Sequence, residues 1–236
     1  MNNQTLRLVL GLTLCPWPAL AQTSVHAPPL PPVAPQVITH GSRQSKTIAL
    51  TFDACQTRKM SGYDAQIISI LREMHTPATL VLGGRWMETH PAATRSLAAD
   101  PLFELGNHSY LHPHMTTLTP LRMRQELLET QDAMYRLTGK QGTVFRPPYG
   151  EYNALLVKQA AQLGLKTLTW EVVTGDPDPH INASSIVRTV LTRAKPGSVV
   201  IMHMNGRGWH TAEALPAVIR GLQKRGYRFV TASQLR

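Results

Sequence analysis

The sequence has few cysteines, few acidic residues and no hydrophobic run of membrane-spanning length. Cys15 and Cys55 are the only cysteines among 236 residues. The chain has 14 Asp and Glu against 24 Lys and Arg, and its first acidic residue is Asp53. A helix needs about 20 apolar residues to cross a bilayer, and the longest apolar run covers only residues 8–14. These shortages argue against a disulfide-rich scaffold and against a transmembrane anchor.

Residues 1–21 predict a secretory signal peptide. A short positively charged segment precedes the apolar run, and Ala19-Leu20-Ala21 forms a small-x-small cleavage site. We expect cleavage near Ala21 and export, to the periplasm or the exterior. Cleavage would leave Cys55 without a disulfide partner, so packing must hold the core.

Residues 22–43 are rich in proline and lack a regular apolar period. The composition favours a disordered tail, and an extended strap or spacer is the alternative. The folded domain is expected to cover residues 44–236.

Residues 44–236 alternate strand-like and helix-like stretches, which indicates an α/β domain. Strands are expected at 47–52, 78–82, 103–106, 143–145, 166–170, 198–202 and 227–230. Helices are expected at 63–74, 91–99, 120–138, 152–163, 183–193 and 212–225. Apolar strands followed by helices favour parallel pairing with both faces covered, and a closed or nearly closed β/α barrel over an open doubly wound sheet.

The expected helix at 120–138 has recognisable ends. Thr119 can cap its first turn, and Gly139 can end it. Leu121, Leu128 and Leu137 are expected to belong to its core-facing stripe.

Reactive side chains follow five of the expected strands. They are Asp53, the pair His108 and His112, Arg146, the pair Asp176 and Asp178, and His203. Each has an ordinary explanation as a cap, turn, ion-pair or core residue. Because the carboxyl ends of parallel strands meet at one rim, five such ends together favour one functional site.

His108 and His112 are candidate metal ligands. Their spacing of four residues can place both imidazoles on one side of a helical turn, where they could hold one divalent metal.

Five segments resemble the ordered motifs of the polysaccharide deacetylases, the nodulation-type or family four carbohydrate esterases. They are Thr51-Phe52-Asp53, His108-Ser109-x-x-His112-Pro113, Arg146-Pro147-Pro148-Tyr149-Gly150, Asp176 six residues after Trp170, and Ile201-Met202-His203. The resemblance extends from about Lys46 to the C-terminus. It implies a distorted β/α barrel of about seven parallel strands and a divalent metal, zinc or alternatively cobalt or nickel. It also implies hydrolysis of N-acetyl groups on an amino-sugar polymer such as peptidoglycan, a chitin-like chain or an exopolysaccharide.

The resemblance also implies a role for each matching residue. His108 and His112 would hold the metal, Asp53 would be the general base, Arg146 would hold Asp53, His203 would be the general acid, Asp176 would orient His203, and the backbone N–H of Tyr149 would bind the oxyanion. A lapsed glycan-binding protein on the same fold and an O-acetyl esterase are the alternatives.

The sequence departs from the family pattern at two positions. Ala54 stands where the family has a second aspartate, its third metal ligand, so Cys55, Asp53, His114 or a water would have to complete the site. Pro177 stands where the family often has tryptophan, which leaves the acyl specificity open.

Two glycine-containing segments, 83–86 and 205–210, each include a tryptophan that could stack on a sugar ring. An ordinary loop is the alternative for both.

The net charge of +10, or +9 after loss of Arg7 with the signal peptide, suits attraction to anionic envelope material. Scattered basic residues and the lack of a nucleic-acid motif argue against nucleic acid as a partner. The sequence does not indicate an oligomeric state.

Overall fold

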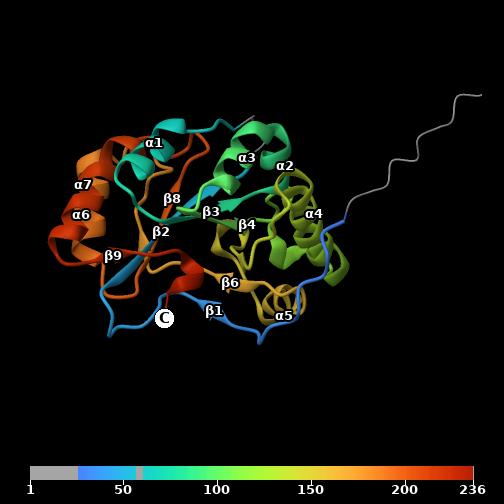
Figure 1. Cartoon of the computed structure of the whole chain (residues 1–236). Coiled ribbons are helices and arrows are strands. Elements are labelled where there is room, and N and C mark those ends of the chain that lie inside the picture. The colour runs from blue at the N-terminus through green and yellow to red at the C-terminus, as the bar shows by residue number, and fades with distance from the viewer. Residues whose placement is uncertain (1–25, 57–60, 236) are drawn as a thin grey trace, which may run out of the picture.

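The computed structural model describes residues 26–56 and 61–235, so the predicted signal peptide lies outside the described residues. Nine strands occur in this part of the chain: β1 (Val37–Ile38), β2 (Thr47–Ala54), β3 (Ala78–Leu82), β4 (Phe103–Asn107), β5 (Val144–Phe145), β6 (Lys166–Leu168), β7 (Val172–Val173), β8 (Val199–His203) and β9 (Arg228–Phe229). Seven α-helices accompany them: α1 (Ala65–Glu73), α2 (Gly84–Thr89), α3 (Pro91–Ala99), α4 (Pro120–Thr138), α5 (Ala154–Gln162), α6 (Ala183–Arg193) and α7 (Thr211–Lys224). Figure 1 shows the helices outside and the strands inside.

The strands form one parallel sheet that curves into a barrel. Their order is β1-β6-β5-β4-β3-β2-β8-β7, with β9 beside β2. β6 lies between β5 and β1, whereas β7 lies beside β8. Residues 169–171 alone connect β6 to β7. One short stretch of chain therefore joins the two sides of the sheet, and the expected distorted β/α barrel is confirmed.

The sequence missed three short elements. β1 and β7 have two residues each, too few to show a pattern, and α2 begins at Gly84 within a glycine pair that resembles a loop. β1 pairs with β6 through Val37 and Ile38, so the sheet begins inside the proline-rich lead, before the expected domain start at residue 44.

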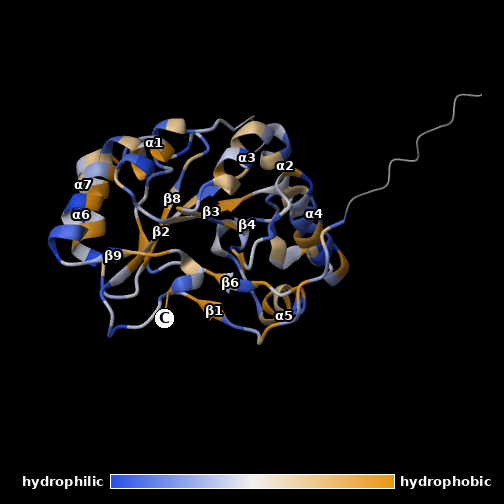
Figure 2. Cartoon of the chain, in the orientation of Figure 1, coloured by the Kyte–Doolittle hydropathy of each residue, from blue (hydrophilic) through white to orange (hydrophobic). Residues whose placement is uncertain are grey.

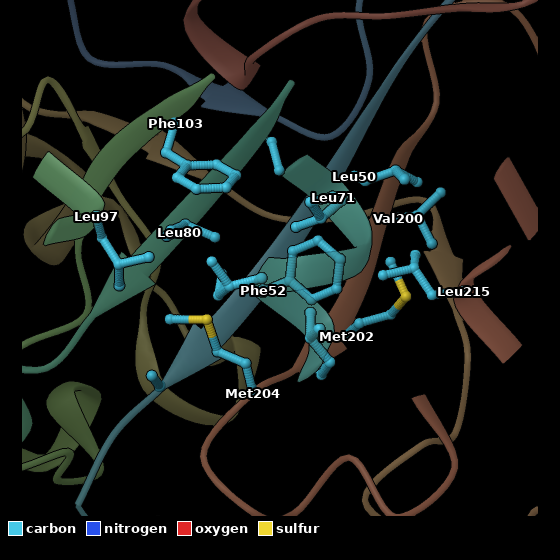
Figure 3. Close-up of a cluster of buried hydrophobic side chains, with 14 of the residues drawn as sticks. Leu50, Phe52, Leu71, Leu80, Leu97, Phe103, Val200, Met202, Met204 and Leu215 are labelled. Atoms are coloured by element: carbon cyan, nitrogen blue, oxygen red, sulfur yellow. The ribbon is translucent and has the colours of Figure 1, made fainter. Parts of the chain in front are cut away.

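The two faces of β2 have different partners, although all its residues are buried. Ile48, Leu50, Phe52 and Ala54 belong to the apolar cluster beneath the helices, where Phe52 lies among Leu80, Met202 and Leu215 (Figure 3). Thr51 and Asp53 occupy the alternate positions and contact polar groups instead. The alternation of side chains along a strand therefore separates the core from the polar interior of the barrel.

Figure 2 shows hydrophobic strands inside and helices that carry both hydrophilic and hydrophobic residues. Such amphipathic helices bury one face and leave the other to solvent. Within residues 26–56 and 61–235, no helix has the length and apolar character needed to cross a membrane.

The ends of α4 are as expected, but its buried face is not. Thr119 accepts a hydrogen bond from the Arg122 N–H at 3.3 Å, and Gly139 ends the helix with φ of 70°. The expected stripe was wrong at Leu121, which is 66% exposed, and at Leu128, which is 38% exposed, whereas Leu137 packs against the core as expected. The buried face instead carries Met123, Glu126, Leu127, Thr130, Gln131, Ala133 and Met134. Polar Glu126 and Gln131 concealed that face from a reading of apolar residues alone.

Residues 26–43 lie on the domain as a strap, so the favoured alternative of a disordered tail is wrong for this segment. Figure 1 shows the strap passing α4 and α5 before it reaches β1. The Ala27 N–H donates to Asp132 Oδ1 at 2.7 Å, and the Val33 N–H donates to the Ala161 carbonyl at 2.9 Å. These hydrogen bonds give the proline-rich backbone specific partners.

The contact between the strap and Gly164 predicts a stability difference. Gly164 has φ of 75°, and a Cβ there would come within 2.5 Å of Leu30 Cβ and 2.9 Å of the Pro31 oxygen. Gly139 is a matched control, because its φ is 70° and a Cβ there would meet nothing within 4 Å. We expect Gly139→Ala to lower the free energy of unfolding by about 1–2 kcal/mol through the backbone alone.

Gly164→Ala should lower it by at least about 1 kcal/mol more, because the added methyl group collides with the strap. Urea denaturation measures both variants. Equal losses would show that the strap does not press on Gly164.

Candidate functional site

A cavity of about 280 Å³ lies at the carboxyl ends of the strands. It is lined by Asp53, Cys55, His108, His112, Pro147, Tyr149, Trp170, Val173, Thr174, Gly175, Asp176, Pro177, Ile201, His203 and Arg207. The structure thus brings six of the seven expected site residues to one cavity, and the seventh, Arg146, lies directly behind Asp53.

Arg146 and Asp53 form a fully buried ion pair. Arg146 Nη1 donates to Asp53 Oδ1 at 2.6 Å, and Nη2 donates to Thr51 Oγ1 at 2.7 Å. The guanidinium also lies over the ring of Trp170, 5.6 Å from its centroid. Thr51 and Trp170 hold Arg146 in place, and neither role was visible in the sequence.

Asp53 stays ionised in this environment. Burial alone would raise the pKa of Asp53, but the charge and hydrogen bond of Arg146, helped by the nearby imidazoles of His108 and His203, outweigh burial and lower it below its ordinary value. Arg146 occupies Oδ1, while Oδ2 lies 3.5 Å from His108 Nε2. The carboxylate therefore presents Oδ2 to the cavity side of the pair.

His108 and His112 meet, although not on a helical turn. Residues 108–114 form no helix, and both Ser109 (φ 61°) and His112 (φ 59°) adopt left-handed backbone conformations. The two rings lie 4.9 Å apart between centroids. The expected pairing of the rings holds, but the expected helical geometry was wrong because local polar contacts shape this loop instead.

Glu126 is the main support of that loop. Its Oε2 accepts hydrogen bonds from the backbone N–H groups of Tyr110, at 2.9 Å, and Leu111, at 2.8 Å. Asn107 Oδ1 accepts from the Ser109 N–H at 3.0 Å. The sequence offered no signal for Glu126, since a glutamate in a helix is ordinarily a surface residue.

Both imidazoles are suited to donate a lone pair. His108 Nδ1 donates to the Arg146 carbonyl at 2.8 Å, which leaves Nε2 without a proton. Burial lowers the pKa of His108, and burial together with the proximity of the His108 ring lowers the pKa of His112 to about 3. Neutral histidines are the form that binds a metal.

The donor atoms fit a divalent metal. Cys55, His108 and His112 each offer one ligand atom, and all three atoms lie within 4.8 Å of one another. Such a set of one sulfur and two nitrogens suits zinc or a similar transition metal. His114 lies apart from this set, since its Nδ1 forms a hydrogen bond with Glu151 Oε2 at 2.9 Å and its ring stacks on that of Tyr149.

Asp176 holds His203. Its Oδ1 lies 3.0 Å from His203 Nδ1, and its Oδ2 accepts hydrogen bonds from the His203 N–H and from Thr211 Oγ1, both at 2.7 Å. Burial lowers the pKa of His203, but the hydrogen bond and charge of Asp176, with help from Asp53, outweigh it and raise the pKa above its ordinary value. His203 and Asp53 are register partners on adjacent strands β8 and β2.

The remaining predicted residues divide between the site and the surface. Tyr149 lies at the cavity with φ of 59° and is 55% exposed. Asp178 is exposed and accepts a hydrogen bond from the His180 N–H at 2.9 Å, which is ordinary turn chemistry. Pro177 does line the cavity.

The tryptophans of the two glycine-containing segments differ in exposure. Trp86 is fully buried in α2 and donates to the Gly62 carbonyl at 3.0 Å, so the sugar-stacking interpretation of residues 83–86 was wrong. Trp209 is 59% exposed, and Arg207 from the same loop lines the cavity.

Comparisons with known proteins agree with the fold and the motifs. The sequence profile of the polysaccharide deacetylases matches residues 40–168, more than half of the chain. The chain therefore belongs to the polysaccharide deacetylase family.

Similar proteins include two cell-wall deacetylases. The peptidoglycan-N-acetylmuramic acid deacetylase of Bacillus subtilis is 29% identical over 198 residues, covering 83% of this chain and 73% of that protein. The peptidoglycan-N-acetylglucosamine deacetylase of Bacillus cereus is 30% identical over 193 residues, covering 81% and 68%.

A similar solved structure is a pseudoenzyme of carbohydrate esterase family four from Bacillus anthracis. It is 29% identical, has a TM-score of 0.77, and the match covers 86% of this chain and 69% of that one. A mutant of that protein with restored enzymatic activity is also similar, with a TM-score of 0.78.

The pairing of Asp176 with His203 predicts a measurable pKa change. In Asp176→Asn the hydrogen bond and charge that favour the imidazolium are weakened, so the pKa of His203 should fall below its ordinary value. Because the folded pKa is raised, this pair stabilises the fold most below about pH 6.5 and loses that effect as pH rises through the folded pKa.

NMR titration of the His203 ring measures the shift. Thr211→Val is the control, since it removes one hydrogen bond from Asp176 and keeps the charge, and it should lower the pKa much less. An unchanged His203 pKa in Asp176→Asn would refute the assigned pairing.

Proposed function

We propose that the protein is a metal-dependent hydrolase that removes N-acetyl groups from amino sugars of an envelope glycan such as peptidoglycan. The observation that carries this proposal is the pairing of Asp53 and His203 across β2 and β8, each held by its own buried partner. A carboxylate poised to accept a proton thus lies beside an imidazole poised to donate one. Membership of the family and the names of the similar cell-wall deacetylases support the substrate class.

Asp53 is the general base in this proposal. Its Oδ2 would take the proton of the attacking water as the water oxygen bonds to the acetyl carbon. Arg146 holds the carboxylate through Oδ1 and keeps it ionised, so that Oδ2 is ready to accept. The backbone N–H of Tyr149, at the cavity, would donate to the oxygen that becomes negative.

His203 is the general acid. Its raised pKa favours the imidazolium, whose proton would pass to the nitrogen as the carbon–nitrogen bond breaks. Acetate and a free amine result. Asp176 would orient the ring and stabilise its charge throughout.

His108 and His112 would hold a divalent metal, zinc or alternatively cobalt or nickel. When bound, such an ion polarises a carbonyl and lowers the pKa of a water. We also propose that residues 1–21 direct export, which would bring a protein of net charge +9 to an anionic envelope.

A glycan-binding role without catalysis is a second candidate. Ala54 removes the family's usual third ligand, and one similar structure is that of a pseudoenzyme. The complete set of Asp53, Arg146, Asp176 and His203 favours the enzyme, since binding alone does not require paired proton carriers.

Replacement of Asp53 by Asn tests the proposal. Acetate release from N-acetylglucosamine oligomers and peptidoglycan should fall by about 10²- to 10⁴-fold, the usual contribution of a general base. The same substitution at exposed Asp178 is the matched control and should leave the rate unchanged.

Each protein is stripped of metal with a chelator and then assayed with added zinc, cobalt or nickel. No acetate from the unaltered protein with any of these metals, together with retained glycan binding, would favour the binding role. Full activity of Asp53→Asn would rule out the assigned base.

A further inference from the structure

The alternation of side chains along β2 bears on how the metal site is completed. Phe52 and Ala54 belong to the apolar cluster under the helices, and Ala54 is fully buried there. Thr51 and Asp53 face the polar interior, and Cys55 follows with the same parity. Asp53 and Cys55 line the cavity, whereas Ala54 does not. After Asp53, the next residue whose side chain reaches the cavity and the histidines is therefore at position 55, not 54.

The ligand atoms of Cys55, His108 and His112 are close enough to share one ion. In tetrahedral zinc sites, bonds of about 2.0–2.3 Å place neighbouring sulfur and nitrogen ligands about 3.3–3.6 Å apart. The three atoms here lie within 4.8 Å of one another, so side-chain movements of about 1 Å would bring all three to bonding distance of one ion. Asp53 is not part of this set.

Asn205 gives the sulfur an independent supporting contact. Its Nδ2 donates to the Cys55 carbonyl at 2.8 Å, which fixes the orientation of the amide, since only the nitrogen can donate. The same Nδ2 lies 3.6 Å from Cys55 Sγ. A donor directed at sulfur suits a thiolate, and such outer contacts commonly support metal ligands.

Asp53 has another partner. Its Oδ1 is held by Arg146 at 2.6 Å, and both groups are buried, so moving the carboxylate onto the metal would disrupt the ion pair. Completion of the site by Cys55 leaves Asp53 free to act as the base.

We propose that Cys55 is the third protein ligand, which makes the centre a sulfur and two-nitrogen site in place of the family's carboxylate and two-histidine site. On binding, the Cys55 thiol loses its proton to solvent as the metal–sulfur bond forms. The site then favours softer, thiolate-binding metals such as zinc and cobalt over magnesium or manganese. This inference deepens the proposed function and rests on it for the identity of the reaction, but not for the ligand.

Cobalt(II) reports directly on the ligand, because coordinated thiolate gives an intense charge-transfer absorption in the near ultraviolet that histidine and carboxylate ligands lack. We expect this band when the metal-free full-length chain is titrated with cobalt. Cys55→Ser should abolish it and weaken cobalt binding by about 100-fold or more, since even partners outside the ligand sphere cost about 10- to 100-fold.

Cys15→Ser is the matched control and should keep both the band and the affinity, since Cys55 is the cysteine that lies beside the histidines in the described part of the chain. Absence of the band from the unaltered protein, or its persistence in Cys55→Ser, would overturn the inference. If circular dichroism shows that Cys55→Ser is unfolded, the presence or absence of the band in the unaltered protein and in Cys15→Ser still tests the inference.

Acetate release is measured on the same samples. Activity without the band overturns the cysteine ligand and leaves the proposed function intact. The band without activity overturns the proposed function and leaves the ligand intact.

Discussion

The buried contact between Arg146 and Asp53 is the constraint on which the rest of the site depends. Arg146 follows β5, yet its side chain reaches Thr51 and Asp53 of β2, and its carbonyl accepts from His108 after β4. One residue therefore sets the position of the proposed base and of one proposed metal ligand. A buried charge whose partner is lost costs about 3–5 kcal/mol, so folding and the arrangement of the site are coupled.

Burial and nearby charges give the titratable groups of this site different protonation states. The barrel interior keeps Asp53 ionised through nearby positive charge and keeps His108 and His112 neutral through desolvation. Asp176 has the opposite effect on His203, whose charged form it favours. Four titratable groups within one cavity are thereby driven toward different protonation states, as acid, base and metal ligands require.

The sequence predicted the main elements, and the candidate site residues that it indicated gather at one cavity, because strand ends and motif order are local features. It did not predict β1, which depends on a distant strand for pairing, or Glu126, whose role exists only once α4 packs beside the histidine loop. It also misplaced Trp86 in a loop, since the glycines before it concealed a helix start. Features that depend on packing between distant segments were the ones missed.

We propose that one cavity holds a metal at His108 and His112 while Asp53 stays paired with Arg146. A crystal structure of the zinc-loaded protein, with anomalous scattering recorded at the zinc edge, tests this arrangement. We expect one zinc about 2.0–2.3 Å from both histidines and from Cys55, with the Arg146–Asp53 pair intact. Zinc bound elsewhere, or bound by Asp53 after it has left Arg146, would contradict this arrangement.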